Sequence, residues 1–228
     1  MSIADNALLL KKDFDDVYEA GTKAEYDRFW DSAQHNGNLT NFNYACAGKF
    51  WTDITFDLKY DIKPATAIGM FNLCRCTDIV ATLNKRGRKI DFSQCTGFTN
   101  LLSYCSSTTF PDIDASNASS IANFCSNNSA LKSLKIKIST KLTNANNAFQ
   151  NCTALEDIEI TGVQISINGF NFASCPLTHD CLVRILTDYL ADKSSVSGSW
   201  VITLGTANLA KLTDAEKAIA TQKGWSLL

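Results

Sequence analysis

A repeat marked by cysteines constrains this sequence more than any other feature. Its segments share a hydrophobic residue three positions before a cysteine, then a polar turn, a Leu or Phe, and a short alternating stretch. The marker cysteines lie 31, 20, 27 and 23 residues apart along the chain: Cys74, Cys105, Cys125, Cys152 and Cys175. A unit of this length cannot bury its own apolar face, so neighbouring units must stack to form a core. The repeat therefore predicts a solenoid.

Two copies of the repeat contain an evident β-strand. In one, Leu134, Ile136 and Ile138 alternate with lysines, and in the other Ile158 and Ile160 alternate with acidic residues. This period of two is expected of a half-buried strand, and the repeat lengths fall in the range of leucine-rich repeats. We predict an α/β repeat fold, a leucine-rich-repeat solenoid.

The cysteines of the repeat are predicted to form a buried column of free thiols, since Cys is a small apolar residue that fits between stacked coils. Disulfides are the first alternative, but the number of cysteines is odd at nine. A zinc site is the second alternative, with four cysteines available: Cys74, Cys76, Cys95 and Cys105. Paired Cys-x-x-Cys spacing is missing, so we predict no metal site.

Residues 1–35 are predicted to form an N-terminal helical stem. Their apolar side chains recur alternately every four and three residues, which places them along one helix seam. The seam consists of Ile3, Ala7, Leu10, Phe14, Val17, Gly21 and Ala24. It either joins copies of the chain through Ile3, Leu10, Phe14 and Val17, as a homo-oligomer, or packs on its own solenoid.

The solenoid is predicted to span residues 36–176, and aromatic residues within 26–52 are expected to close its N-terminal end. Residues 177–228 are expected to close the other end with a helix, a strand and a second helix. Thr178 is a candidate N-cap for the first helix, and Thr213 with Glu216 forms a capping box for the second. Gly224 is expected to end that second helix.

The repeats and the flanks resemble a known family. The segments TNANNAFQNCTALEDIEI (143–160) and SIANFCSNNSALKSLKI (120–136) resemble BspA-type leucine-rich repeats. Residues 18–53 and 177–225 resemble the ends of phage-encoded or prophage-encoded leucine-rich-repeat proteins of gut bacteria. The resemblance implies a BspA-like solenoid in a virion, associated with the tail or baseplate and with other tail proteins. It implies no reaction and no catalytic residues.

Charge and hydropathy exclude several classes of partner. The formal net charge is −2, which gives no field that would attract nucleic acid. The apolar run at residues 7–10 is too short for a signal peptide, and no run is long enough to span a membrane. We therefore expect a protein without a signal peptide, with no nucleic-acid partner and no membrane insertion; the resemblance implies that it is made in the bacterial cytoplasm.

Two clusters of charge have alternative interpretations. The basic run at residues 85–89 (KRGRK) is interpreted as a solvated loop, with contact to phosphates or to an anionic glycopolymer as the alternative. The acidic residues of 13–19 are interpreted as one solvated helix face, with calcium binding as the alternative.

The sequence contains no familiar signature of catalysis. Motifs typical of nucleotide-binding proteins, metalloproteases and serine hydrolases are absent, so we predict no enzyme and no cofactor. His179 and Cys181 are the nearest approach to a nucleophile and its base, but residues two apart on a helix point to different sides.

The function predicted from the sequence is recognition of a bacterial surface glycan or protein through Ser-, Thr- and Asn-rich turns, whose groups both donate and accept hydrogen bonds. Two other non-enzymatic functions remain open: an architectural virion component that docks into a larger assembly, and a bacterial surface adhesin. A polysaccharide depolymerase is a third alternative, but paired carboxylates are not evident.

Overall fold

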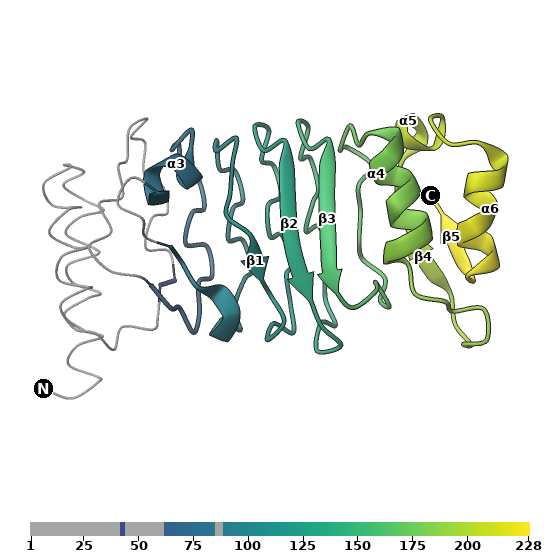
Figure 1. The fold of residues 1–228 in the computed structure, drawn as a ribbon, viewed down its shortest axis with the longest axis horizontal. Coiled ribbons are helices and arrows are strands. Elements are labelled where there is room, and N and C mark those ends of the chain that lie inside the picture. Colours follow the sequence, from purple (N-terminus) through teal and green to yellow (C-terminus); the bar gives the residue numbers. More distant parts are fainter. Residues whose placement is uncertain (1–41, 44–61, 85–88) are drawn as a thin grey trace, which may run out of the picture.

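The computed structural model describes residues 42–43, 62–84 and 89–228. The predicted helical stem, with Ile3, Leu10, Phe14 and Val17, lies outside these residues, as do the acidic cluster and residues 85–88 of the basic run. Through the described part, successive coils follow one another along the long axis of the molecule and lead into a helix-rich C-terminal end (Figure 1). We call residues 62–176 the coil stack and residues 177–228 the cap.

Three neighbouring coils contribute one strand each to a parallel sheet. The strands are β1 (Ile113–Asp114), β2 (Ser133–Ile138) and β3 (Asp157–Gly162), in that order. Ile136 lies between Ile113 and Ile160 in the register, and residues of β2 alternate between exposed and buried. The alternation is the one that the sequence predicted for this strand.

A second row of parallel bridges joins the coils at the corner that follows the strands. Thr66 pairs with Gly97, Gly97 with Ser120, and Ser120 with Asn144. A Cβ atom at Gly97 would lie 2.4 Å from the Thr66 hydroxyl oxygen, so a larger residue cannot occupy this position without moving a neighbour. The close approach explains why one coil has glycine in this row.

After its bridge residue, each coil turns back toward the next strand through a segment that we call the return segment. This segment also contacts the following coil. Alternate backbone N–H groups of one segment donate to carbonyl oxygens of the next, as from Phe71 to Leu101 (2.9 Å). Leu102 N–H donates to Phe124 O at 2.7 Å, and Cys125 N–H donates to Ala148 O at 2.9 Å. These hydrogen bonds fix which residues are equivalent in successive coils.

The backbone register corrects one part of the sequence alignment. Cys125 occupies the position of Phe71 and Phe149, whereas Asn128 is the residue equivalent to Cys105 and Cys152. Equivalent residues are 31, 23, 24 and 23 positions apart: Cys74, Cys105, Asn128, Cys152 and Cys175. The Asn128 side chain suits this position because its Oδ1 atom accepts from the backbone N–H groups of Ala130 and Leu131. Alignment on cysteines alone missed this substitution.

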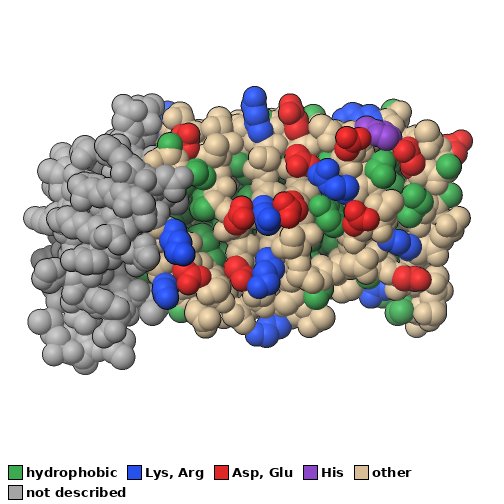
Figure 2. All heavy atoms as spheres, viewed as in Figure 1, with side chains coloured by type: hydrophobic (Ala, Val, Ile, Leu, Met, Phe, Trp, Pro, Cys, Tyr) green, Lys and Arg blue, Asp and Glu red, His purple; other side chains and the backbone are tan. Residues whose placement is uncertain are grey.

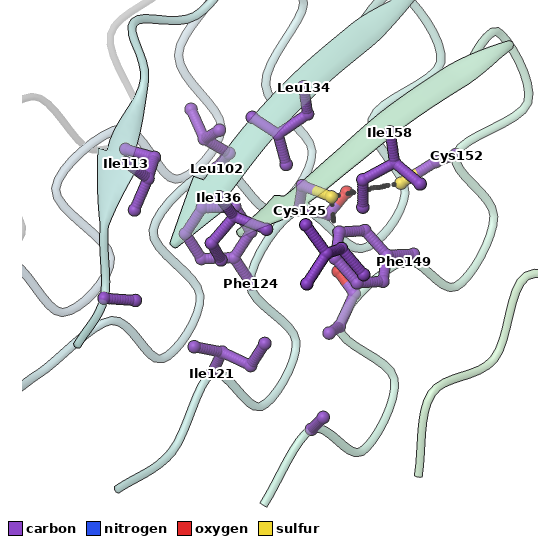
Figure 3. Close-up of a cluster of buried hydrophobic side chains, with 14 of the residues drawn as sticks. Leu102, Ile113, Ile121, Phe124, Cys125, Leu134, Ile136, Phe149, Cys152 and Ile158 are labelled. Carbon is purple, nitrogen blue, oxygen red and sulfur yellow. Dashed lines mark hydrogen bonds between the residues drawn. The ribbon is translucent and has the colours of Figure 1, made fainter. Parts of the chain in front are cut away.

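The apolar core lies between the strands and the return segments. Figure 3 shows Phe124 and Phe149 pointing from the return segments toward Ile136 and Ile158 on the strands, so the two walls of each coil face each other across the core. Phe149 also stacks on Phe172 of the next coil, with ring centroids 5.0 Å apart. Because the walls face inward, their exposed sides point in opposite directions.

The longest coil interval, between Cys74 and Cys105, contains additional elements. Helix α3 (Ile79–Asn84) and the short 3-10 helix η1 (Phe92–Gln94) lie in this interval. Asp78 precedes α3, and its Oδ1 atom accepts from Ala81 N–H at 2.8 Å and from the Thr109 hydroxyl at 2.6 Å. The carboxylate therefore links the start of the helix to the neighbouring coil.

The cap contains four helical segments and two strands. They are α4 (His179–Arg184), the π-helix η2 (Ile185–Tyr189), β4 (Trp200–Ile202), α5 (Thr206–Leu209), α6 (Asp214–Gln222) and β5 (Trp225–Leu227). Thr178 caps α4, and Thr213 with Glu216 forms the capping box of α6, which confirms both capping predictions. The expected ending at Gly224 is also found, because this residue has a φ of 80°.

Individual polar side chains attach the cap to the chain around them. The buried Asn208 places its Nδ2 atom within 3.1 Å of three carbonyl oxygens, two of which belong to Phe172 and Cys175 of the last coil. The Lys223 ammonium lies within 3.0 Å of three carbonyl oxygens at η2 and its end. One apolar core extends through both parts of the molecule. The leucine-rich-repeat class and the boundaries predicted at 35/36 and 176/177 stay predictions.

Candidate functional site

The exposed side of β1, β2 and β3, which we call the strand face, has charges of both signs in alternation (Figure 2). Lys135 Nζ lies 3.0 Å from Glu159 Oε1 and 4.0 Å from Asp112 Oδ2, and Lys137 Nζ lies 3.0 Å from Asp114 Oδ2. Exposed pairs of this kind add little to stability, but they neutralise one another. The strand face therefore offers little net charge to a ligand.

The opposite side of the coils, formed by the return segments, we call the turn face. Each of four coils has two residues with positive φ, three and seven positions after its bridge residue. The first row consists of Gly69, Asn100, Asn123 and Asn147, and the second of Leu73, Tyr104, Asn127 and Asn151. Glycine and asparagine adopt this left-handed conformation more readily than other residues, which explains six of the eight positions.

Amide groups of the turn face interact from one coil to the next. Asn151 Nδ2 donates to Asn127 Oδ1 at 2.9 Å. On the corner before the bridge row, Lys141 Nζ donates to Asn117 Oδ1 at 2.6 Å and the Ser139 hydroxyl donates to Ser116 O. Polar side chains thus link neighbouring coils both on the turn face and at this corner.

All eight cysteines among the described residues are free and buried. Cys125 and Cys152 are in contact, with 3.4 Å between their sulfur atoms (Figure 3). Burial and the adjacent Cys152 thiol raise the pKa of Cys125 well above its ordinary value. Burial also raises the pKa of Cys95 and of Cys181 to about 11 each. These raised values leave the Cys95, Cys125 and Cys181 thiols protonated near neutral pH, so they serve packing.

The structure does not bring His179 and Cys181 together as a catalytic pair. His179 Nε2 lies 3.0 Å from Glu216 Oε1 and connects α4 to α6. Cys181 is buried and accepts a hydrogen bond from Ile158 N–H through its sulfur at 3.4 Å. The Thr213 N–H and hydroxyl hydrogen bonds to Glu216 lower the pKa of that carboxyl, with a further contribution from His179. The arrangement fits a helix cap.

Among the residues that the structure describes, no group of three or more His, Cys, Asp or Glu side chains has a geometry that could hold a metal ion. None of the helices in these ranges combines the length and the apolar character that a membrane crossing requires.

Comparisons with known proteins identify no relative. No protein-family model matches the sequence, and neither the curated proteins nor the solved structures include a match.

The candidate site is therefore the pair of exposed faces built by the repeat. Sequence reasoning placed function in the Ser-, Thr- and Asn-rich turns but named no contact residue. It missed the two exceptions on the turn face, Leu73 and Tyr104. An alignment of the repeats on their recurrent asparagines would have singled them out, because the other residues of those two rows are asparagine or glycine.

Proposed function

We propose that this chain is a non-enzymatic binding module, a BspA-type leucine-rich-repeat solenoid that recognises a glycan on a bacterial surface. The observation that carries the proposal is the repetition of uncharged hydrogen-bonding side chains along the turn face, as in the contact between Asn127 and Asn151. Sugar hydroxyls both donate and accept hydrogen bonds, and so do amides and hydroxyls of Asn, Ser and Thr.

The strand face supports the same class of ligand. Its lysines and acidic residues already neutralise one another, so a strongly charged ligand gains little by binding there. A repeat that presents equivalent residues at regular intervals suits an extended, repetitive partner better than a compact one. Among partners on a bacterial surface, a polysaccharide has this regularity.

We propose a phage tail or baseplate as the setting, on the basis of the resemblance of residues 18–53 and 177–225 noted above. In this setting the module would place a binding surface on the virion, next to other tail proteins. An architectural role in the same particle is the competing proposal.

Binding of the purified full-length chain tests the proposal. The protein, labelled at a surface lysine, is incubated with bacterial cells and with cell-wall polysaccharide extracted from the same strains, and bound protein is measured. We expect saturable binding that free polysaccharide displaces and that pretreatment of the cells with protease leaves intact. Loss of binding after protease treatment identifies a protein receptor instead. Absence of binding to every strain favours the architectural role.

A further inference from the structure

Two large apolar side chains occupy strained positions on the turn face. Leu73 and Tyr104 have φ values of 58° and 56°, in the left-handed region that disfavours residues other than glycine and asparagine. The equivalent positions of the next two coils hold Asn127 and Asn151. The first two coils therefore depart from the pattern that the other two follow.

Both side chains are also exposed to solvent, Leu73 by 50% and Tyr104 by 57%. They are neighbours, since Leu73 N–H donates to Ser103 O at 2.8 Å and Tyr104 N–H donates to Ser126 O at 2.9 Å. The next coil continues the row, because Asn127 N–H donates to Gln150 O. Coils paired in this way are about 4.8 Å apart. We call Leu73, Tyr104, Asn127 and Asn151 the turn row.

Stability does not explain Leu73 and Tyr104. Asparagine or glycine at either position would relieve the backbone strain and would remove apolar surface from water. Adjacent exposed apolar side chains mark interaction sites, and strained residues concentrate where they serve a function. Apolar exposure and backbone strain coincide at the same position of two consecutive coils.

We propose that the turn row binds a linear, uncharged polysaccharide segment that lies along the coil axis. This inference rests on the proposed glycan recognition and assigns it to four residues. The Tyr104 ring packs against the apolar face of one sugar ring, and Leu73 extends the apolar contact to the adjoining unit. Asn127 and Asn151 bind hydroxyl groups of the following units through their amides.

The chemistry of the row selects this class of ligand. None of its four side chains carries a charge, and the positions immediately before them are also uncharged: Asn72, Ser103, Ser126 and Gln150. The row itself thus holds no cation for a phosphate or an acidic sugar; the basic residue nearest to it along the chain is Arg75, two residues after Leu73. The hydrogen bond between Asn151 Nδ2 and Asn127 Oδ1 orients both amides and leaves their remaining groups for a ligand. The coil spacing is comparable with the length that one sugar unit adds to an extended chain.

Substitutions in the turn row test the proposal in the full-length protein. Tyr104→Asn and Leu73→Asn introduce the residue that the other coils use, so both variants are expected to fold with a raised unfolding temperature. Tyr104→Phe keeps the ring and serves as the conservative variant, and Lys217→Ala on α6, which belongs to neither face, is the control. The probes are linear neutral glucan and N-acetylglucosamine oligomers from monosaccharide to hexasaccharide, measured by titration calorimetry.

The expected result is a loss of affinity of at least about tenfold for Tyr104→Asn, a smaller loss for Leu73→Asn, and little change for Tyr104→Phe and Lys217→Ala. Affinity should rise with oligomer length up to about four units, one for each coil in the row, and then level off. Equal binding by wild type and by the double variant Leu73→Asn, Tyr104→Asn overturns the turn-row assignment alone. Absence of oligosaccharide binding by the wild type contradicts the glycan proposal itself, and capture of a cell-surface protein through Tyr104 replaces it with a protein partner.

Discussion

The coil stack and the cap share one apolar core, yet different interactions hold their chains in place. In the coil stack, equivalent residues of successive coils contact one another, as Phe149 does with Phe172 and Asn127 with Asn151. In the cap, by contrast, the single polar side chains of Asn208 and Lys223 each contact three carbonyl oxygens. The difference shows that repetition supplies contacts inside a stack, whereas its end needs specific anchors.

Removal of a buried aromatic side chain from the coil stack should have the largest effect on the free energy of unfolding. Phe149 is fully buried against Phe170 and Phe172, so Phe149→Ala leaves a cavity that rigid neighbouring coils cannot fill. We expect a loss of about 3–5 kcal/mol in the free energy of unfolding, measured by urea denaturation. A loss below about 1 kcal/mol would mean that the coils collapse around the cavity, contrary to a stack of fixed register.

Removal of a polar anchor from the cap should cost less. Asn208→Ala leaves carbonyl oxygens of Phe172, Cys175 and Leu204 without their amide donor in a buried site. The expected loss is about 2–3 kcal/mol in the same measurement. Lys217→Ala, at a partly exposed site on α6, is the control and should leave the unfolding midpoint unchanged. If Asn208→Ala behaves like the control, water replaces the amide and the cap does not depend on this anchor.

A third variant asks whether a polar anchor inside the stack acts as those of the cap do. The Ala81 N–H and the Thr109 hydroxyl both donate to Asp78, and these bonds lower the pKa of its carboxyl. Asp78→Asn keeps an acceptor oxygen but loses its charge, so at neutral pH, where the carboxylate is ionised, it should cost at most about 1 kcal/mol. Because the folded-state pKa is the lower one, the carboxylate stabilises the protein above the ordinary pKa of Asp and loses that effect as the pH falls through the folded value. Thermal unfolding between pH 7 and pH 2 should therefore show the two proteins converging in acid, and a constant difference would contradict this assignment.

The smallest effect is expected on the strand face. Lys135 is exposed, and its pairs with Glu159 and Asp112 join neighbouring coils only at the surface. Lys135→Ala should leave the unfolding midpoint within experimental error of wild type at physiological salt. A clear destabilisation would show that charge rows, and not only the core, hold the coils together.

Sequence reasoning went furthest where local rules decide the structure. The alternation of Leu134, Ile136 and Ile138 predicted a strand, and the capping box at Thr213 predicted the start of α6, because both depend on residues close in the chain. The coil register depends on backbone hydrogen bonds between distant segments, so the alignment of Cys125 with Cys152 was wrong. Asn128 fills that position through its side-chain hydrogen bonds, which a search for cysteine cannot detect.

The sequence predicted the type of candidate site but not the residues that form it. Abundant Ser, Thr and Asn pointed to hydrogen-bonding turns, but the composition of a turn does not reveal which of its residues adopt a left-handed backbone. Leu73 and Tyr104 carry no local signal of that conformation, since the backbone around them is set by contacts with the following coil. Their importance became visible only when equivalent positions of four coils were compared.

The corrected repeat length has a consequence for how such a chain can change. Four equivalent residues follow one another at nearly constant intervals of 23, 24 and 23 positions: Cys105, Asn128, Cys152 and Cys175. Duplication or deletion of one such interval within a gene would keep every backbone partner in phase and alter only the span of the molecule. The reach of the protein over a long ligand can therefore evolve in whole steps, while both of its ends stay as they are.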